Sequence, residues 1–332
     1  MKQIKTNQSG IAHLAIILLV VLAGIAGFAG YRVIQSNKTK TTADKAQKTG
    51  AEISNSSASN LSWKEGGLVV PGAYADADVV KVSNNQWRMY YASQPEGGKL
   101  EVYSASSSDG KTWTQESGTR KTMATFPNVV KLKDGSYRMY YQSAGVIKSA
   151  ISSDGLSFTD EAGTRIDTAN SENLVFDNVA APSVVLKDDG TFVMIYRGSI
   201  NSRYAANTPN PSTQLLMWAT SNDGLTFIKK GIAVDSRNST LNGQLDGPYL
   251  IKWDDGKYHL FATSYTGVYE FTFDGSKYGQ PALVLAGEAK KTDMGFTGSP
   301  PGDPTVASIN GTWFMYYGGP REQNGIHYAT LE

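Results

Sequence analysis

The chain of 332 residues contains no cysteine and only 3 histidines. The absence of cysteine excludes disulfides and thiolate metal sites, so packing alone must hold the fold together. Three histidines make a zinc site or a Ser-His-Asp triad difficult to assemble. The formal net charge is only +1, and this balance argues against nucleic acid as a partner.

One long apolar run is present, from Ile11 to Gly30, and only His13 interrupts it. About 20 apolar residues match the thickness of a bilayer core. The run therefore predicts a transmembrane signal-anchor helix at 11–30, behind a short tail at 1–10. A cleaved secretory signal is the alternative, because Gly27, Phe28 and Ala29 place small residues at a suitable spacing.

Residues 31–56 are rich in Ser, Thr, Asn, Lys and Ala and contain few large apolar side chains. Such a segment cannot form a core, so we expect a flexible linker. A tether of this kind suits a domain held at a cell surface. The expected location is the cell membrane, with a single span and the rest of the chain outside the cytoplasm; secretion after cleavage is the alternative.

The remainder, 57–332, repeats one pattern of a short β-branched strand, a Gly, Asn or Asp turn, and an aromatic-rich strand. Its copies are DADVVKVSNNQWRMYYAS from Asp76, FPNVVKLKDGSYRMYYQS from Phe126, APSVVLKDDGTFVMIYRGS from Ala181, DGPYLIKWDDGKYHLFATS from Asp246 and GDPTVASINGTWFMYYGG from Gly302. Repeats of roughly 50 residues built from short strands are typical of β-propellers. The sequence therefore predicts an all-β, five-bladed β-propeller over 57–332.

A second turn recurs after the third strand of a repeat, as SSDGKTW from Ser107, SSDGLSF from Ser152 and SNDGLTF from Ser221. These turns resemble the Asp-box of sialidases, in which Ser and Asp side chains bond the backbone of their own turn. We therefore assign no chemistry to Asp109, Asp154 and Asp223.

The matching turn of the last repeat is found at the other end of the domain. Ser57 to Trp63 aligns with the turn pattern, and WKEGGLVV from Trp63 aligns with FIKKGIAV from Phe227. The N-terminal strand is therefore expected to be the fourth strand of the last blade, which closes the ring and removes an exposed edge.

The starts of the innermost strands carry the candidate chemistry. Alignment places Asp76, Phe126, Ala181, Gly247 and Asp303 in one column, with Asp246 one position earlier. Long connections gather at the same end, which marks it as the functional face. Three carboxylates, Asp76, Asp246 and Asp303, are therefore predicted to share the axial mouth. One protonated and one ionised carboxyl in a pocket suit acid/base cleavage of a glycosidic bond.

Further side chains are expected to bind substrate on this face, because Arg pairs with carboxylates and Tyr stacks on sugar rings. These candidates are Asp78, Phe126, Arg197, Arg203, Tyr204, Tyr265 and Arg321.

These motifs resemble the five-bladed glycoside hydrolases of family 43, the arabinanases and β-xylosidases, and their relatives in family 32, the invertases and levanases. DGPYLIKWDDGKYHLF from Asp246 is similar to the general-acid segment of that group, which usually begins Glu-Gly-Pro. The resemblance implies that Asp76 is the general base, that Asp246 is the acid and that cleavage inverts the anomeric centre. Asp303 would be a supporting carboxylate.

The chain departs from the family pattern at three blades. Asp246 stands where Glu is usual, Ala181 replaces a third-blade Asp, and blade five has no axial His. A surface protein that binds glycans without cleaving them is therefore the alternative function. A six-bladed sialidase fits less well, because the repeats number five. Carbohydrate and membrane are the expected partners and no cofactor is expected; no ligand cluster supports calcium on the axis.

Overall fold

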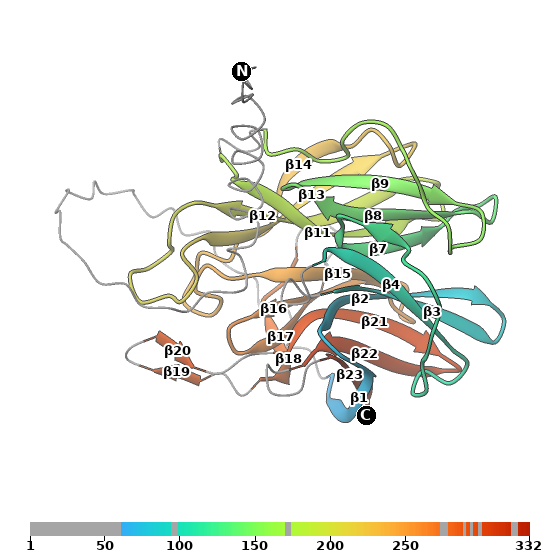
Figure 1. The fold of residues 1–332 in the computed structure, drawn as a ribbon. Helices are drawn as coiled ribbons and strands as arrows, with labels where there is room; N and C mark the ends of the chain where they lie inside the picture. Colours follow the sequence, from blue (N-terminus) through green and yellow to red (C-terminus); the bar gives the residue numbers. More distant parts are fainter. Residues whose placement is uncertain are drawn as a thin grey trace, which may run out of the picture. The chain divides into compact units, whose positions relative to one another are not determined.

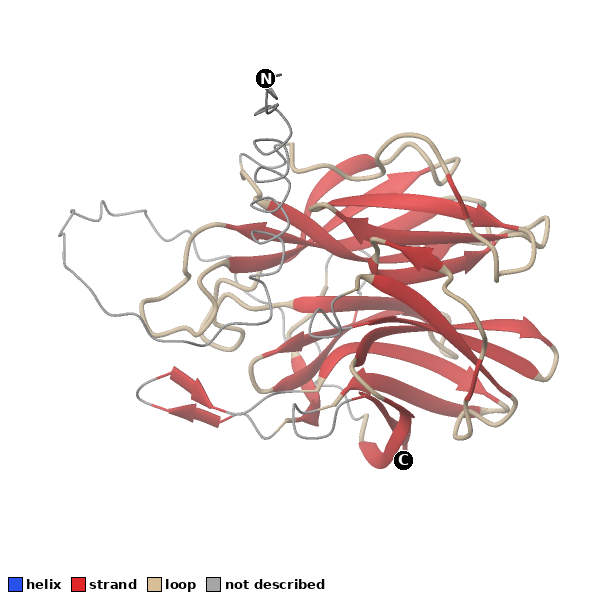
Figure 2. Ribbon diagram, in the orientation of Figure 1, coloured by secondary structure: helices blue, strands red, loops and turns tan. Residues whose placement is uncertain are grey.

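The computed structural model describes residues 61–93, 99–169, 174–272, 278–287, 290–292, 295–297, 301–319 and 325–332. All of them belong to one unit, Ser57–Glu332. They form strands and loops without a helix (Figure 2). No helix long and apolar enough to cross a membrane occurs within these ranges. The predicted membrane span at 11–30 and the linker at 31–56 lie outside the described residues.

The strands form five antiparallel sheets that match the five predicted repeats (Figure 1). Blade 1 comprises β2 (Tyr74–Ser83), β3 (Gln86–Ser93), β4 (Glu101–Ser107), β5 (Thr114–Gln115) and β6 (Lys121–Thr122), and both short strands pair with β4. Blade 2 comprises β7 (Thr125–Lys131), β8 (Tyr137–Ser143), β9 (Val146–Ser152) and β10 (Thr159–Asp160). Blade 3 comprises β11 (Asn178–Leu186), β12 (Phe192–Ile200), β13 (Thr213–Ser221) and β14 (Ile228–Val234).

The last two blades complete the propeller. Blade 4 comprises β15 (Asp246–Lys252), β16 (Tyr258–Ser264), β17 (Gly267–Thr272) and β18 (Ala282–Ala286). Blade 5 comprises β21 (Gly302–Ile309), β22 (Thr312–Gly318), β23 (Gly325–Leu331) and β1 (Trp63–Pro71). A separate hairpin, β19 (Lys290–Thr292) and β20 (Gly295–Thr297), lies in the long connection between these blades and was not predicted.

The first strand of each blade faces the centre. In Figure 1 the strands β2, β7, β11, β15 and β21 lie together in the middle of the domain. Each contacts the innermost strand of the next blade, and β21 contacts β2, so the ring is closed. The predicted five-bladed propeller is confirmed.

The N-terminal strand closes the ring as the sequence predicted. β1 pairs with β23 from Trp63, opposite Leu331, to Pro71, opposite Gly325. Gly67 and Gly231 both sit at bulges, with φ of 117° and 110°, which confirms the alignment of β1 with β14. Pairing with β1 removes the free edge that β23 would otherwise expose.

The core lies between blades, and every second strand contributes to it. One residue in the middle of each second strand is fully buried: Met89, Met139, Met194, Leu260 and Met315. The aromatic residues near the start of the second strands are buried in blades 1 to 3 (Trp87, Tyr137 and Phe192) and half-buried in blades 4 and 5 (Tyr258 and Trp313). No blade could bury this surface alone, which is why the repeats stabilise one another.

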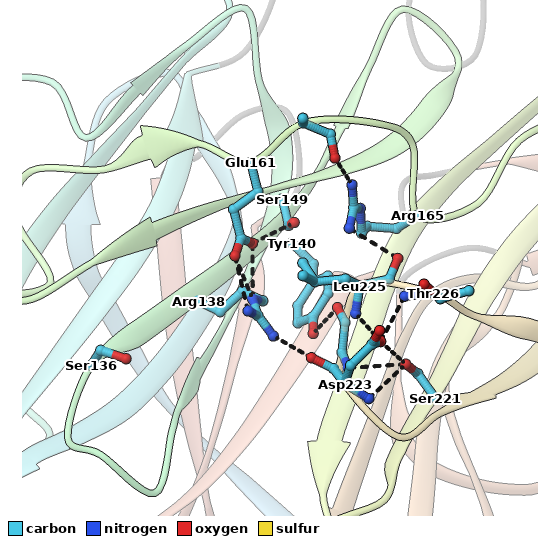
Figure 3. Close-up of polar contacts among 12 residues, drawn as sticks. Ser136, Arg138, Tyr140, Ser149, Glu161, Arg165, Ser221, Asp223, Leu225 and Thr226 are labelled. Carbon is cyan, nitrogen blue, oxygen red and sulfur yellow. Dashed lines mark hydrogen bonds and ion pairs between the residues drawn. The ribbon is translucent and has the colours of Figure 1, made fainter.

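The Asp-box turns connect neighbouring blades (Figure 3). Oδ1 of Asp223 accepts hydrogen bonds from the amides of Leu225 and Thr226, each at 2.8 Å. From blade 2, the Tyr140 hydroxyl donates to the Gly224 carbonyl at 2.8 Å, and Arg138 donates to the Asp223 carbonyl at 2.9 Å. These contacts confirm that the turn has a folding role, because its side chains are engaged in backbone bonds.

The same contact, from a tyrosine hydroxyl to the turn of the next blade, recurs at two further junctions. Tyr90 bonds the carbonyl of Gly155 at 2.8 Å, and Tyr316 bonds that of Gly110 at 2.7 Å. Blade 3 carries Ile195 at the equivalent position, where a hydroxyl bond is excluded. There Tyr278, which lies between β17 and β18 in blade 4, packs against the cluster that contains Ile195. Apolar packing thus replaces the hydrogen bond at this junction.

Candidate functional site

Each innermost strand begins with the same backbone irregularity. Five residues have left-handed φ values: Asp76 (55°), Phe126 (50°), Ala181 (48°), Gly247 (51°) and Asp303 (50°). A shift of the strand register accompanies each of them. Positive φ is uncommon for residues with a side chain, so its repetition shows that the five positions are equivalent. The predicted column is confirmed.

Proline follows this bulge in four blades, at Pro127, Pro182, Pro248 and Pro304. Proline has no amide hydrogen, so it is tolerated where a bulge interrupts the ladder. All five bulge residues and the four prolines line one cavity of about 30 Å³ on the ring axis. This volume corresponds to about one water molecule.

Asp76 lies at this cavity with a side chain that is almost fully buried (8% exposed). Its Oδ2 accepts a hydrogen bond from the amide of Phe126 at 3.2 Å. Burial raises the pKa of Asp76 to about 7, and the charge of Asp246 adds to this effect. A hydrogen bond from Asp303 and the charge of Arg197 act in the opposite direction on this pKa.

Asp303 is buried to the same extent (8% exposed). Its amide donates to Oγ1 of Thr263 at 3.1 Å, whereas its Oδ1 has no hydrogen-bond partner among the described residues. Burial raises the pKa of Asp303 well above its usual value, and the charges of Asp76 and Asp246 raise it further. A Cβ atom at Gly247 would overlap Oδ1 of Asp303, so only glycine fits beside this carboxyl.

Asp246 differs from the other two carboxylates in having a cation. It is 2% exposed and forms an ion pair with Arg197, and its Oδ1 accepts the amide of Gly247 at 2.8 Å. The guanidinium of Arg197 also lies over the ring of Phe126, 5.5 Å from its centroid, and bonds Asn178 at 3.3 Å. Unlike Asp76 and Asp303, neither Asp246 nor Arg197 is among the residues that line the axial cavity.

Asp78 lies at the same cavity but is engaged by the next blade. Its Oδ1 accepts the side-chain amide of Asn128 at 3.0 Å and its Oδ2 accepts the amide of Val129 at 2.7 Å. Burial raises the pKa of Asp78 to about 7, while these bonds and one with Tyr249 lower it. Both oxygens of this predicted substrate ligand are therefore bonded to protein.

Sequence reasoning missed the pattern to which Asp78 belongs. Two residues after each bulge stands a polar side chain: Asp78, Asn128, Ser183, Tyr249 and Thr305. Asn128 accepts the amide of Val184 and Ser183 accepts the amide of Leu250, each at 2.8 Å. These bonds join neighbouring blades beneath the carboxylates. The signal in the sequence was a polar residue at the same position of every repeat, two residues after the bulge.

The outer candidates lie away from the axial cavity. Arg203 bonds the carbonyls of Thr208 and Pro209 in its own loop. Tyr204 is exposed, and the hydroxyl of Tyr265 accepts the amide of Asn210 at 3.1 Å. None of the three predicted side chains lines the axial cavity. Arg321 lies outside the described residues.

No group of three or more His, Cys, Asp or Glu side chains in the described part of the chain is arranged to hold a metal ion.

Comparison of the sequence with known families and curated proteins finds no match. Solved structures, in contrast, share the fold. A thermostable family-43 glycoside hydrolase is 15% identical, with 79% of this chain and 90% of that chain covered and a TM-score of 0.56. An α-L-arabinofuranosidase from Clostridium thermocellum is 17% identical, with 77% and 89% covered and a TM-score of 0.55.

An endo-arabinase from Bacteroides thetaiotaomicron is 14% identical, with 80% of this chain and 97% of that chain covered and a TM-score of 0.57. At these identities the likeness establishes a shared five-bladed architecture. The expected resemblance to family 43 therefore holds at the level of the fold.

Proposed function

We propose that this chain is a glycoside hydrolase that cleaves oligo- or polysaccharides by carboxylate acid/base catalysis. The observation that carries the proposal is that Asp76 and Asp303 line one axial cavity, while Asp246 lies close enough for its charge to raise the pKa of both. Their environments differ, since two carboxyls have raised pKa values and the third is paired with Arg197. Different proton affinities within one pocket are what acid/base cleavage requires. The glycosidases that share the fold support this assignment.

In this mechanism Asp76 is the general base. A pKa of about 7 is suited to proton transfer near neutral pH. Ionised Asp76 takes a proton from water as the water attacks the anomeric carbon, and the carboxylic acid of Asp246 protonates the departing oxygen. One such displacement inverts the anomeric centre. Asp246 is ion-paired with Arg197 in the structure, so it acts as the acid only after the entering sugar displaces this guanidinium and Asp246 takes up a proton from water.

The decisive experiment compares full-length wild type with Asp76→Asn on arabino-, xylo-, galacto- and fructo-oligosaccharides. Loss of a general base is expected to lower kcat/KM by about 10²- to 10⁴-fold. Asp188→Asn is the matched control, since Asp188 is exposed on the turn at the other end of β11 and should leave turnover unchanged. Equal turnover by wild type and Asp76→Asn removes Asp76 from the mechanism.

A glycan-binding protein without hydrolysis is the second candidate. Ala181 leaves blade 3 without an axial carboxylate, and Asp246 is held in an ion pair with Arg197. Both observations favour binding without hydrolysis. Sugar binding that persists in Asp246→Asn, together with no cleavage by wild type, would decide for this alternative.

We also propose that residues 11–30 tether the domain to a membrane, outside the cytoplasm. The length and apolarity of the run support this assignment. Membrane fractionation combined with protease treatment of intact cells tests it, since release of the chain by alkaline carbonate would argue for a cleaved signal instead.

A further inference from the structure

Asp76 and Asp303 are neighbours, and neither forms an ion pair with a cation among the residues that the structure describes. They occupy equivalent bulges on β2 and β21, which are in contact, and both line the axial cavity. Within the described residues, the nearby guanidinium of Arg197 is bonded to Asp246 instead. Two buried carboxyls that share a site cannot both carry a charge without a large cost, so one of them retains its proton.

We propose that Asp76 and Asp303 share a single proton, which resides on Asp303 and is donated in a hydrogen bond to the carboxylate of Asp76. Asp303 is then a positioning residue: it fixes the charge and the orientation of the base without touching the reacting atoms. The structural part of this inference is independent of the activity, whereas its effect on catalysis rests on the proposed function.

The surroundings of the two carboxyls show which one holds the proton. Asp76 accepts the amide of Phe126, and hydrogen bonding to the charged form stabilises that form. Oδ1 of Asp303 receives no such donor. The same contact between the pair lowers the pKa of Asp76 and raises that of Asp303. The asymmetry therefore places the proton on Asp303.

The nearby charges of Asp246 and Arg197 act on both members of the pair alike. Asp246 on β15 raises both pKa values, and Arg197 on β12 lowers both. β7 contributes the backbone amide of Phe126, and β16 contributes the hydroxyl of Thr263. Asp78 on β2 is bonded to the side chain and backbone of β7. None of these groups reverses the order of the two titrations.

The short separation of Asp76 and Asp303 also bears on whether Asp303 can be the catalytic acid. An inverting glycosidase holds its acid and base roughly 6.5–9.5 Å apart so that water fits between them. A hydrogen-bonded pair leaves no such space, so Asp303 is not the acid that acts opposite Asp76.

At high pH Asp303 loses its proton, the pair carries two charges, and Asp76 loses its hydrogen-bond donor. The pair therefore limits the site at alkaline pH.

Carboxyl titration of the full-length protein tests the shared proton directly. Aspartate labelled with ¹³C at Cγ is followed by NMR in wild type, Asp76→Asn, Asp303→Asn and the control Asp188→Asn. We expect Asp76 to show two inflections in wild type and to lose the upper one in Asp303→Asn. In Asp76→Asn, the titration of Asp303 should move to lower pH by about one unit or more, because a neighbouring charge is removed.

Independent single titrations that neither substitution changes would overturn the inference. Thermal unfolding of each variant identifies any loss of fold, and Asp303→Ser, which retains a donor without a titrating group, then replaces Asp303→Asn. Loss of the upper inflection in the serine variant supports the pair, and its persistence contradicts it.

The pH dependence of kcat/KM provides the second readout. Asp303→Asn should shift the alkaline limb to higher pH, since the amide donates at every pH. Complete inactivity of a folded Asp303→Asn at every pH would identify Asp303 as the acid and overturn its positioning role. If wild type cleaves no sugar although the two carboxyls titrate together, the glycosidase proposal fails and the shared proton stands.

Discussion

At the scale of single residues, the axial site combines backbone strain with buried charge. Asp76, Phe126, Ala181 and Asp303 adopt left-handed conformations despite having side chains, and each such conformation costs of order 1–3 kcal/mol. The ring of inter-blade bonds beneath them, such as Asn128 to Asp78, holds the bulges in place. The strain brings the side chains of four different blades to one point.

Removal of Arg197 should test how the charge of Asp246 is compensated. Arg197→Met leaves Asp246 buried without its cation, and breaking a buried pair costs about 3–5 kcal/mol. Urea unfolding measures the loss. Arg203→Met, on an exposed loop, is the matched control and should cost less than about 1 kcal/mol.

The double variant Arg197→Met with Asp246→Leu should recover much of this stability, because the uncompensated charge is gone. If Arg197→Met alone unfolds at the wild-type urea concentration, the ion pair is not what neutralises Asp246.

At the scale of elements, neighbouring blades are joined by side-chain contacts that recur at equivalent positions of the repeats. The contacts from Tyr140 and Arg138 to the turn at Asp223 (Figure 3) have a counterpart in those from Tyr90 and Arg88 to the turn at Asp154. Because each set of contacts connects the second strand of one blade to the turn of the next, it opposes separation of the blades.

Loss of one of these tyrosine hydroxyls should have a measurable cost. Tyr140→Phe removes the bond to the buried carbonyl of Gly224, and the expected loss in the free energy of unfolding is about 1–2 kcal/mol. The exposed Tyr204→Phe should change stability by less than about 0.5 kcal/mol. Equal stabilities of the two variants, measured by guanidinium unfolding, would show that the hydroxyl bond does not stabilise the junction.

At the scale of the whole molecule, the propeller depends on a strand from the opposite end of the chain. β1 pairs with β23, and Trp63 packs edge-on against Phe261 with 6.2 Å between ring centroids. Deletion of 1–71 should therefore unfold or aggregate the domain, since loss of a buried Trp alone costs about 3–5 kcal/mol and β23 becomes a free edge.

Deletion of 1–56 is the matched control, because it leaves β1 intact. Thermal unfolding and size-exclusion chromatography compare the two forms. A monomeric protein of unchanged melting temperature after deletion of 1–71 would contradict the role of β1 in closure.

The sequence alone determined the number of blades, the closing strand and the column of axial residues. These features are written as local patterns repeated at a regular interval, and equivalent places in the repeats become equivalent places in the ring. The alignment of β1 with β14 and the left-handed column from Asp76 to Asp303 are direct results of this regularity.

Only the tertiary structure decided how the axial residues are paired. The ion pair of Arg197 with Asp246, the proximity of Asp76 to Asp303 and the commitment of Asp78 to blade 2 all join residues from different blades. Nothing in one repeat specifies which side chain of another repeat it meets. Burial sets the proton affinities of these carboxyls, and burial exists only once the five blades have closed around the axis.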